Sequence, residues 1–543
     1  GEGVKVRKPF VASTDPKKRF DGLLKLGDLY QKAGQTADAE ETFIQAAAAQ
    51  PAGQDEGQRR LADLYFDEGK MSQAEPVYRA VYTNSKTKDR NVMYRLAETL
   101  IREGKYDDAH DLLRKEVLAK SPEEPKALTL EAEASFAQEK YDDALASLAK
   151  VLGKNPDDPD ALFYQAQCYL AKGTNLDQAT NDLLRLSDST NPAATSDKTK
   201  MNTGIALARV YRAARKYAEA SITFQSLIKS YPRVANLRLM YAEYLMWVAG
   251  MEKDLAPSDV RSAADSIRAV HAQDTLRTVL ADAEKNFPKL AAWSVMEGNL
   301  DSLNGDQAGA LAKYEAAYHA SNENADVASV YLGSLLNAKR YDDVITLADH
   351  LSAAHPENPD YLVKRGTARA KTGQFDQAGN DFNRAFSLTA ANPDAYMQVN
   401  QAAAAAMGAE KLLSVVRARE KNNPDELAAQ VDAGTLLMML KKNDDAEKAF
   451  SAVTGNAKNS PVKVLALRGL AMVEYQQKQY EPAYRTYMEL LAAKPNDVES
   501  LNNLSYMLAE DMHRAKEAVG YAARALAAVR SGNTEQGLVT AGN

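Results

Sequence analysis

The apolar and polar residues along this chain alternate with a helical period that is interrupted at regular intervals. In residues 201–232, apolar residues recur every three or four positions up to Tyr211, and again from Ala220 through Phe224. Two basic residues separate the runs, and Pro232 ends the second because proline cannot continue a helical backbone ladder. The pattern predicts two short amphipathic helices, here named helix A and helix B. One such hairpin cannot bury its own apolar face, so it needs neighbours.

The same hairpin returns along the chain with a period of about 34 residues. Helix A carries Leu-Gly or Leu-Ala and then a large residue, and helix B carries alanine and an aromatic or leucine before a closing proline, as in Leu26, Gly27, Tyr30, Ala39, Phe43, Ala46 and Pro51. Shifts of 35 positions lead to Leu61, Ala62, Tyr65, Ala74 and Tyr78, and then to Leu96, Ala97, Leu100, Ala109 and Leu113. This pattern resembles the tetratricopeptide repeat, with about 14 copies from Asp21 to about Val529.

The resemblance implies an all-α fold, a right-handed α-α superhelix of about 14 helical hairpins. Small residues such as Gly27 and Gly434 are expected to let helix A approach helix B, and Trp293 is expected to lie in the core. The repeat phase divides the chain as follows: a basic extended arm at 1–20, an N-terminal repeat array at 21–247, a helical insertion at 248–273, a C-terminal array at 274–530 and an irregular tail at 531–543.

The insertion at 248–273 breaks the repeat phase by about 22 residues. Ser258 is a plausible N-cap, and Val260, Ala264, Ile267 and His271 form a narrow stripe, so an extra helix is expected there. Insertions in repeat arrays tend to map to one face, often the binding face.

Composition excludes several classes of protein. A net charge of -7 argues against a nucleic-acid coat, which needs a concentrated basic surface. We find no run of about 18 apolar residues, so no transmembrane segment is expected. The single cysteine, Cys168, allows no intrachain disulfide, which fits a reducing cytoplasm or a thiol-poor bacterial envelope protein.

The compartment stays open at this point, with the bacterial periplasm or cell envelope favoured over the cytoplasm. The alanine-rich, thiol-poor, many-repeat composition resembles large bacterial-type scaffolds. The sequence starts at Gly1 rather than methionine, so an N-terminal segment is expected to have been removed.

Candidate catalytic groups have a structural explanation. Acidic pairs recur at the start of helix B in several copies, where they complement the helix dipole, at Asp107 and Asp108, Asp142 and Asp143, Asp342 and Asp343, and Asp444 and Asp445. The six histidines form no HExxH motif, and glycine-rich phosphate loops and GxSxG are absent. Cys168 is expected to be a buried structural residue. We therefore expect no enzyme activity, no metal site and no cofactor.

A binding surface is the remaining possibility. In the family that the chain resembles, helix A side chains that point away from helix B line the concave face. By position, this implies partner-binding roles for Tyr94, Arg95, Phe163, Tyr164, Arg209, Arg212, Met240, Met246 and Trp247, and places Met438 and Met439 near the same face. Leu24 and Asp28 stand where a chaperone-binding carboxylate clamp would need Lys and Asn, so a chaperone adaptor is not expected.

Two functional hypotheses follow. The first is a non-enzymatic scaffold that binds a partner protein or an extended peptide along its concave surface. The alternative is a structural subunit that self-associates through its C-terminal end, end to end or within a larger complex, because no polar capping helix is visible there.

Overall fold

The computed structural model describes residues 15–51, 53–84, 88–188, 190, 194–255, 262–389, 392–423, 425–456 and 461–532. These residues form helices joined by short turns, and no strand occurs among them. The predicted all-α solenoid of about 14 hairpins is confirmed.

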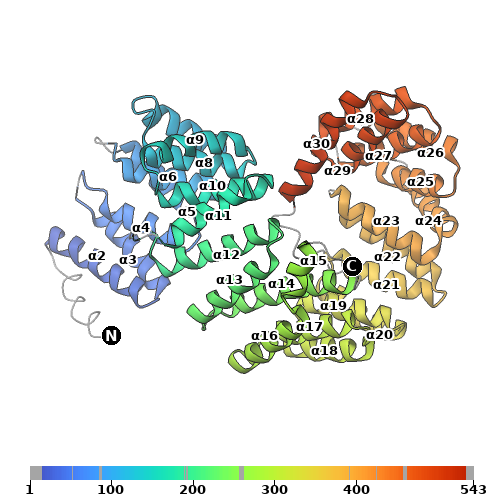
Figure 1. The fold of residues 1–543 in the computed structure, drawn as a ribbon, viewed down its shortest axis with the longest axis horizontal. Coiled ribbons are helices and arrows are strands. Elements are labelled where there is room, and N and C mark those ends of the chain that lie inside the picture. Colours follow the sequence, from blue (N-terminus) through green and yellow to red (C-terminus); the bar gives the residue numbers. More distant parts are fainter. Residues whose placement is uncertain are drawn as a thin grey trace. The chain divides into compact units, whose positions relative to one another are not determined.

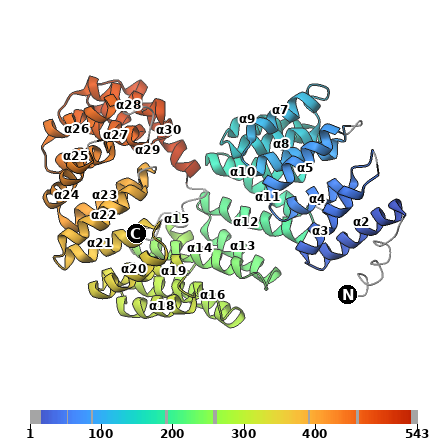
Figure 2. The same ribbon diagram turned by 180° about the vertical axis from the view of Figure 1, so that it is seen from behind.

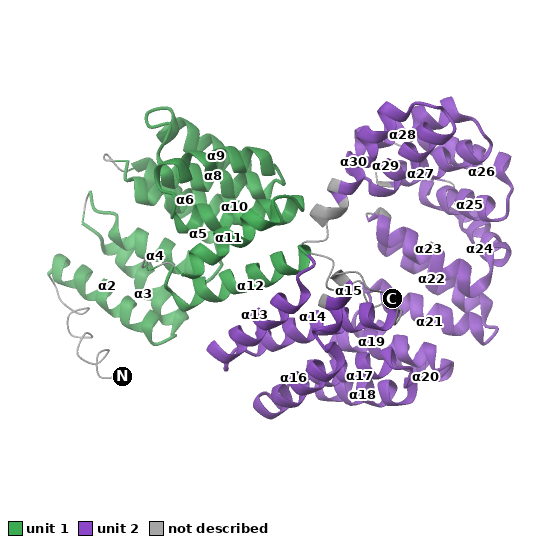
Figure 3. Ribbon diagram, viewed as in Figure 1, with its two compact units in different colours: residues 1–214 green, residues 215–543 purple. Residues whose placement is uncertain are grey.

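The helices fall into two units, residues 1–214 and 215–543, each described by itself (Figure 3). Unit 1 contains α2 (Pro16–Lys32), α3 (Thr36–Ala49), α4 (Glu56–Asp67), α5 (Met71–Asn84), α6 (Arg90–Arg102), α7 (Tyr106–Leu113), the π-helical turn η1 (Arg114–Leu118), α8 (Pro125–Ala137), α9 (Tyr141–Lys154), α10 (Pro159–Lys172), α11 (Leu176–Ser187) and α12 (Asp197–Ala213).

Unit 2 contains the remaining helices in chain order (Figures 1 and 2). These are α13 (Tyr217–Ser230), α14 (Ala235–Asp254), α15 (Ser262–Arg268), α16 (Ala272–Asn286), α17 (Ala292–Leu303), α18 (Gln307–Ala320), α19 (Ala325–Asn337), α20 (Tyr341–Ala354), α21 (Pro359–Lys371), α22 (Phe375–Thr389), α23 (Pro393–Met407), α24 (Ala409–Asn422), α25 (Leu427–Met439), α26 (Asn443–Asn456), α27 (Pro461–Gln476), α28 (Tyr480–Ala493), α29 (Val498–Glu510) and α30 (Ala515–Gly532). The boundary between the units falls inside the hairpin of residues 201–232.

Several hairpins close around a small residue on helix A and a large one on helix B. Phe450 on α26 follows Gly434 on α25 by 16 positions (450 minus 434), and the same separation joins Gly27 to Phe43. A Cβ added to Gly434 would lie 2.8 Å from the Phe450 ring, and one added to Gly469 on α27 would overlap the same ring. The Phe450 ring therefore packs between two glycines, one in its own repeat and one in the next. This confirms the predicted role of the small residues.

The acidic pairs occupy the places predicted for them. Asp107 and Asp108 lie in the first turn of α7, and the pairs of α9, α20 and α26 lie in the first turns of those helices. There they face the positive end of the helix dipole, which supports their structural interpretation. Trp293 is 2% exposed, and its indole N–H donates to the carbonyl of Phe287 at 3.0 Å, so it is a core residue as predicted.

The insertion differs in part from the expectation. Residues 248–254 continue α14, and the extra helix α15 follows with Ala264 and Ile267 buried. His271 is exposed and adopts a left-handed conformation directly before α16, so it does not extend the stripe as predicted. Ser258 and Val260 lie outside the described residues.

The predicted terminal segments are only partly described. Helix α2 begins at Pro16, with the side chain of Asp15 accepting hydrogen bonds from the backbone of Lys17 and Lys18. The last residues of the expected extended arm are therefore helical, because Asp15 and Pro16 form a good helix start. Helix α30 extends to Gly532, two residues into the expected irregular tail. The remainder of both segments, 1–14 and 533–543, lies outside the described residues.

A buried polar network joins α23, α24 and α25 in unit 2. The carboxylate of Asp432 is 0% exposed and accepts hydrogen bonds from the hydroxyl of Tyr396 at 2.6 Å and the amide of Asn400 at 3.0 Å. Arg419 forms an ion pair with it at 3.1 Å and a second one with Glu426 at 2.9 Å. Burial raises the pKa of Asp432 to about 7, although Arg419, Tyr396 and Asn400 favour its charged form.

Candidate partner-binding surface

Most residues predicted to bind a partner are partly buried by their neighbours. Trp247 on α14 contacts Tyr217 and Tyr244, with ring centroids 5.7 Å and 6.3 Å apart. Phe224 stacks on Tyr241 in the same aromatic cluster. Trp247 is therefore largely a packing residue of unit 2, and Met246 beside it is half-buried.

Other predicted residues have similar surroundings. Phe163 and Tyr164 on α10 are half-buried, with their own rings 5.9 Å apart. Among the other predicted residues, Tyr94 on α6, Arg209 and Arg212 on α12, Met240 on α14 and Met438 on α25 are all half-buried. Arg95 and Met439 are exposed.

Arg95 belongs to a connected polar surface on the A helices of unit 1. Its guanidinium lies 3.2 Å from the carboxylate of Glu98 on the same helix, and Lys126 on α8 reaches Glu98 at 3.0 Å. On the preceding repeats, Arg60 of α4 lies 3.5 Å from Asp28 of α2. These ion pairs link consecutive A helices across the repeat boundaries.

The carboxylates of this surface occupy one repeat position. They are 35 positions apart (63 minus 28, 98 minus 63, 133 minus 98), at Asp28, Asp63, Glu98 and Glu133. Together with Arg60, Arg95, Lys126 and Tyr164 we name them the A-helix face of unit 1. Asp63 accepts a hydrogen bond from Tyr78 at 2.5 Å and is thus tied to the core, whereas Glu98 pairs only with the cations of the face.

Aromatic side chains lie beside these charges. The guanidinium groups of Arg95 and Arg102 lie over the ring of Phe66, 4.7 Å and 4.2 Å from its centroid. The ring of Tyr164 is 6.1 Å from that of Phe136, and its hydroxyl bonds to Glu133. Partial burial raises the pKa of Glu133, because it is removed from water without a direct cation partner among the contacts that the structure gives.

The sequence prediction included Arg95 and Tyr164 but missed the acidic residues. Their signal was present, since four carboxylates recur at one spacing of 35 residues. That signal is weak by itself, because charged residues recurring on a helix usually form a solvated surface. The ion pairs between consecutive A helices show that these carboxylates form one connected surface, which the spacing alone could not establish.

No other chemistry stands out among the residues that the structure describes. Within those ranges, no group of three or more His, Cys, Asp or Glu side chains could hold a metal ion. Cys168 is buried, and burial raises the pKa of its thiol to about 12. None of the helices described is both long enough and apolar enough to cross a membrane.

Comparison with protein families gives repeat matches in both units. Models of the tetratricopeptide repeat match residues 24–88, 129–186 and 431–498, and a second such model matches residues 206–233. A model of the anaphase-promoting complex, cyclosome, subunit 3 matches residues 67–151. No curated protein sequence matches this chain.

Solved structures with similar arrangements are distant in sequence. The chain is 11% identical to one in the crystal structure of the APC/C hetero-tetramer Cut9-Hcn1, covering 98% of each chain with a TM-score of 0.29. Yeast Tom70 is 15% identical over 96% of this chain and 99% of its own, with a TM-score of 0.31. A tetratricopeptide repeat protein from Parabacteroides merdae is 14% identical over 58% of this chain and 98% of its own, with a TM-score of 0.32. Likenesses at this level carry no argument about function.

Proposed function

Because this chain is an α-solenoid of tetratricopeptide repeats, and such proteins typically mediate protein–protein interactions, we propose that it is a non-enzymatic scaffold. Its partner is a protein or an extended peptide that binds along the A-helix face of unit 1. The alanine-rich, thiol-poor composition supports a large bacterial-type scaffold as its class.

One observation carries this proposal. The repeat uses its apolar positions for packing, and the A-helix face of unit 1 combines ionic, aromatic and hydrogen-bonding side chains outside that core. Glu98 and Glu133 offer carboxylates, Arg95 offers a guanidinium, and the ring of Tyr164 is half-buried beside them. Arginine and aromatic residues are enriched at binding hot spots. Of the residues predicted from the sequence, Arg95 and Tyr164 are retained in the proposed surface.

The other predicted residues serve as weaker candidates. Arg209, Arg212, Met240 and Met246 remain part of the proposal as half-buried contributors. Trp247 is a poor probe of binding, since its removal would disturb the aromatic cluster of unit 2.

A pair of substitutions that removes two negative charges from the A-helix face tests it. We would immobilise the full chain, capture proteins from an extract of the source cells and compare the recovered set with that of E98Q/E133Q. The matched control is E41Q/D111N, which removes two exposed carboxylates from the B helices α3 and α7 of the same unit. We expect partners to be lost from E98Q/E133Q and retained by the control, with the same thermal unfolding for all three proteins. Equal recovery by both variants would remove this face from the proposal.

A second candidate function, self-assembly through the C-terminal end, has one observation in its favour. Helix α30 exposes Val519 and Leu526, as an uncovered repeat interface would. The outer surface of α2 is charged, with Lys17, Lys18 and Arg19 exposed, so it does not complement that apolar surface in an end-to-end stack. Light scattering over a concentration series tests this candidate, since a constant mass of 59.3 kDa would exclude it.

A further inference from the structure

The last described helix carries an apolar stripe with the spacing of a helix-packing seam. Ala515, Val519, Ala522 and Leu526 follow one another at intervals of four, three and four residues. Val519 is 69% exposed and Leu526 is 51% exposed. Within the described part of the chain, this stripe is therefore left uncovered.

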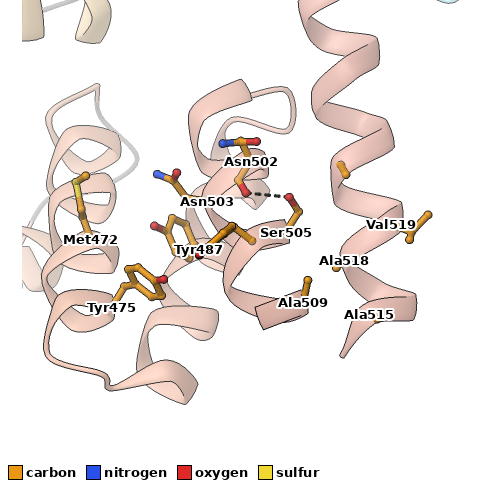
Figure 4. A pocket seen from close by; sticks show the side chains of 12 residues that line it. Met472, Tyr475, Tyr487, Asn502, Asn503, Ser505, Ala509, Ala515, Ala518 and Val519 are labelled. Carbon is orange, nitrogen blue, oxygen red and sulfur yellow. Dashed lines mark hydrogen bonds between the residues drawn. The ribbon is translucent and has the colours of Figure 1, made fainter. Parts of the chain in front are cut away.

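The stripe lies beside a pocket of about 490 Å³ in the C-terminal part of unit 2. Side chains of four helices line it (Figure 4), with Met472 and Tyr475 on α27, Tyr487 on α28, Ser505 and Ala509 on α29, and Ala515 on α30.

A large aromatic side chain extends the apolar surface on α29. Tyr506 also lines the pocket and is 60% exposed. We name the pocket together with the stripe the terminal groove.

The preceding repeat shows what normally covers such a stripe. Tyr487 and Leu491 on α28 precede Ala522 and Leu526 by 35 positions (522 minus 487, 526 minus 491). They are 2% and 5% exposed. The next helix A, α29, packs against α28, and Asn503 on it bonds to the hydroxyl of Tyr487. The terminal groove is thus continuous with an established type of interface, in which an α-helix is the occupant.

The side chains of the terminal groove determine how large the apolar side chains of a bound helix must be. At the position of Tyr487, α30 has Ala522, so a large ring is replaced by a methyl group. A helix that fills the groove must therefore present bulky apolar side chains where the repeat's own A helices can be small.

We propose that the terminal groove binds an amphipathic α-helix of a partner protein, with bulky apolar residues spaced at i, i+4, i+7 and i+11. Residues 533–543 do not carry this apolar spacing, because Leu538 and Val539 are the only large apolar residues among them. A second copy joined head to tail is disfavoured by the charged outer surface of α2.

The test is a titration of the full chain with two synthetic fluorescent peptides of about 15 residues, each stapled into a helix to remove the folding cost of a short peptide. One has leucine and phenylalanine at the proposed spacing, and the other has the same composition with the apolar residues scattered around the helix. The groove variant is V519E/L526E, and the control K516Q/E517Q changes two exposed residues on the same helix. Because Val519 and Leu526 are exposed, the groove variant is expected to keep the circular dichroism spectrum and melting temperature of the parent chain.

We expect the striped peptide to bind the parent and the control equally, to bind V519E/L526E about tenfold or more weakly, and to outcompete the scattered peptide. Equal affinity for parent and groove variant, or no binding of the striped peptide, would overturn the proposal. Light scattering provides an independent outcome: a dimer of the parent that V519E/L526E converts to a monomer would assign the groove to a second copy and would also overturn it. None of these results depends on the A-helix face of unit 1.

Discussion

The ion pair between Arg419 and Asp432 offers the sharpest test of how unit 2 is stabilised. Asp432 has no exposed surface, Arg419 is 7% exposed, and the two groups are 3.1 Å apart. In R419M the carboxylate would keep only Tyr396 and Asn400 as hydrogen-bond donors. We expect R419M to destabilise the packing of α23, α24 and α25.

The size of the effect follows from burial. Removing one partner of a buried ion pair leaves an uncompensated charge and costs about 3–5 kcal/mol. In D432N the new amide oxygen can still accept from Tyr396, and Arg419 keeps its ion pair with Glu426 at 2.9 Å, so the loss is one of charge-assisted bonding, about 1.5–3 kcal/mol. In R419M/D432N no buried charge is left, so the double variant should be more stable than R419M, with a coupling energy of about 2 kcal/mol.

Hydrogen–deuterium exchange followed by mass spectrometry is the suitable assay, because long repeat arrays need not unfold in a single step. Peptides from α23 to α25 report the local opening free energy, and peptides from unit 1 serve as the internal control. If R419M and R419M/D432N open with the same free energy, the two charges are not coupled and the reasoning fails.

Four further outcomes follow from the structure. In urea titrations, G469A should be less stable than the parent, because overlap with Phe450 costs about 1–3 kcal/mol while the higher helix propensity of alanine returns at most about 1 kcal/mol. G520A, whose added methyl group lies in open space, should be more stable than the parent by about 0.5–1 kcal/mol. W247A should lower the free energy of unfolding of unit 2 by about 2 kcal/mol through lost contacts with Tyr217 and Tyr244, which would be seen as a lower melting temperature, with unchanged partner capture. Cys168 should react with a thiol reagent only after denaturation, because burial raises its pKa to about 12. The raised pKa of Asp432 means that the folded state binds its proton more tightly than the unfolded state does. The stability gained from this proton is complete below the ordinary pKa of 3.8 and is lost as pH rises through about 7. In unfolding experiments at a series of pH values, the stability of the parent relative to D432N should therefore fall over this range, and a flat difference would contradict the assignment.

The repeat positions were predictable because local packing imposes them. In these hairpins a small residue on helix A contacts a large residue on helix B at a fixed separation in the sequence. The contact of Gly434 with Phe450 was therefore predictable from the repeat period alone. The acidic pairs of the B helices were predictable for the same reason, since every helix start presents the same dipole.

Features specific to one repeat were not predictable in this way. The partnership of Asp432 with Arg419 and Tyr396 joins three helices, and no regular spacing along the chain reveals it. The partial burial of Trp247 depends on Tyr217 from another helix, and a count of positions along α14 alone cannot foresee it. The carboxylates of the A-helix face could be recognised in the sequence by their regular separation of 35 residues. Their ion pairs could not, because these depend on how consecutive helices are aligned.

The charged surface of α2 and the apolar stripe of α30 differ in what a neighbouring hairpin would have to bury. A duplicated hairpin joined after α30 would find apolar surface of the kind that repeats bury against each other. The same hairpin joined before α2 would have to dehydrate Lys17, Lys18 and Arg19, which costs free energy unless each finds a partner. A hairpin placed after α30 would therefore bury apolar side chains, whereas one placed before α2 would have to bury charged ones.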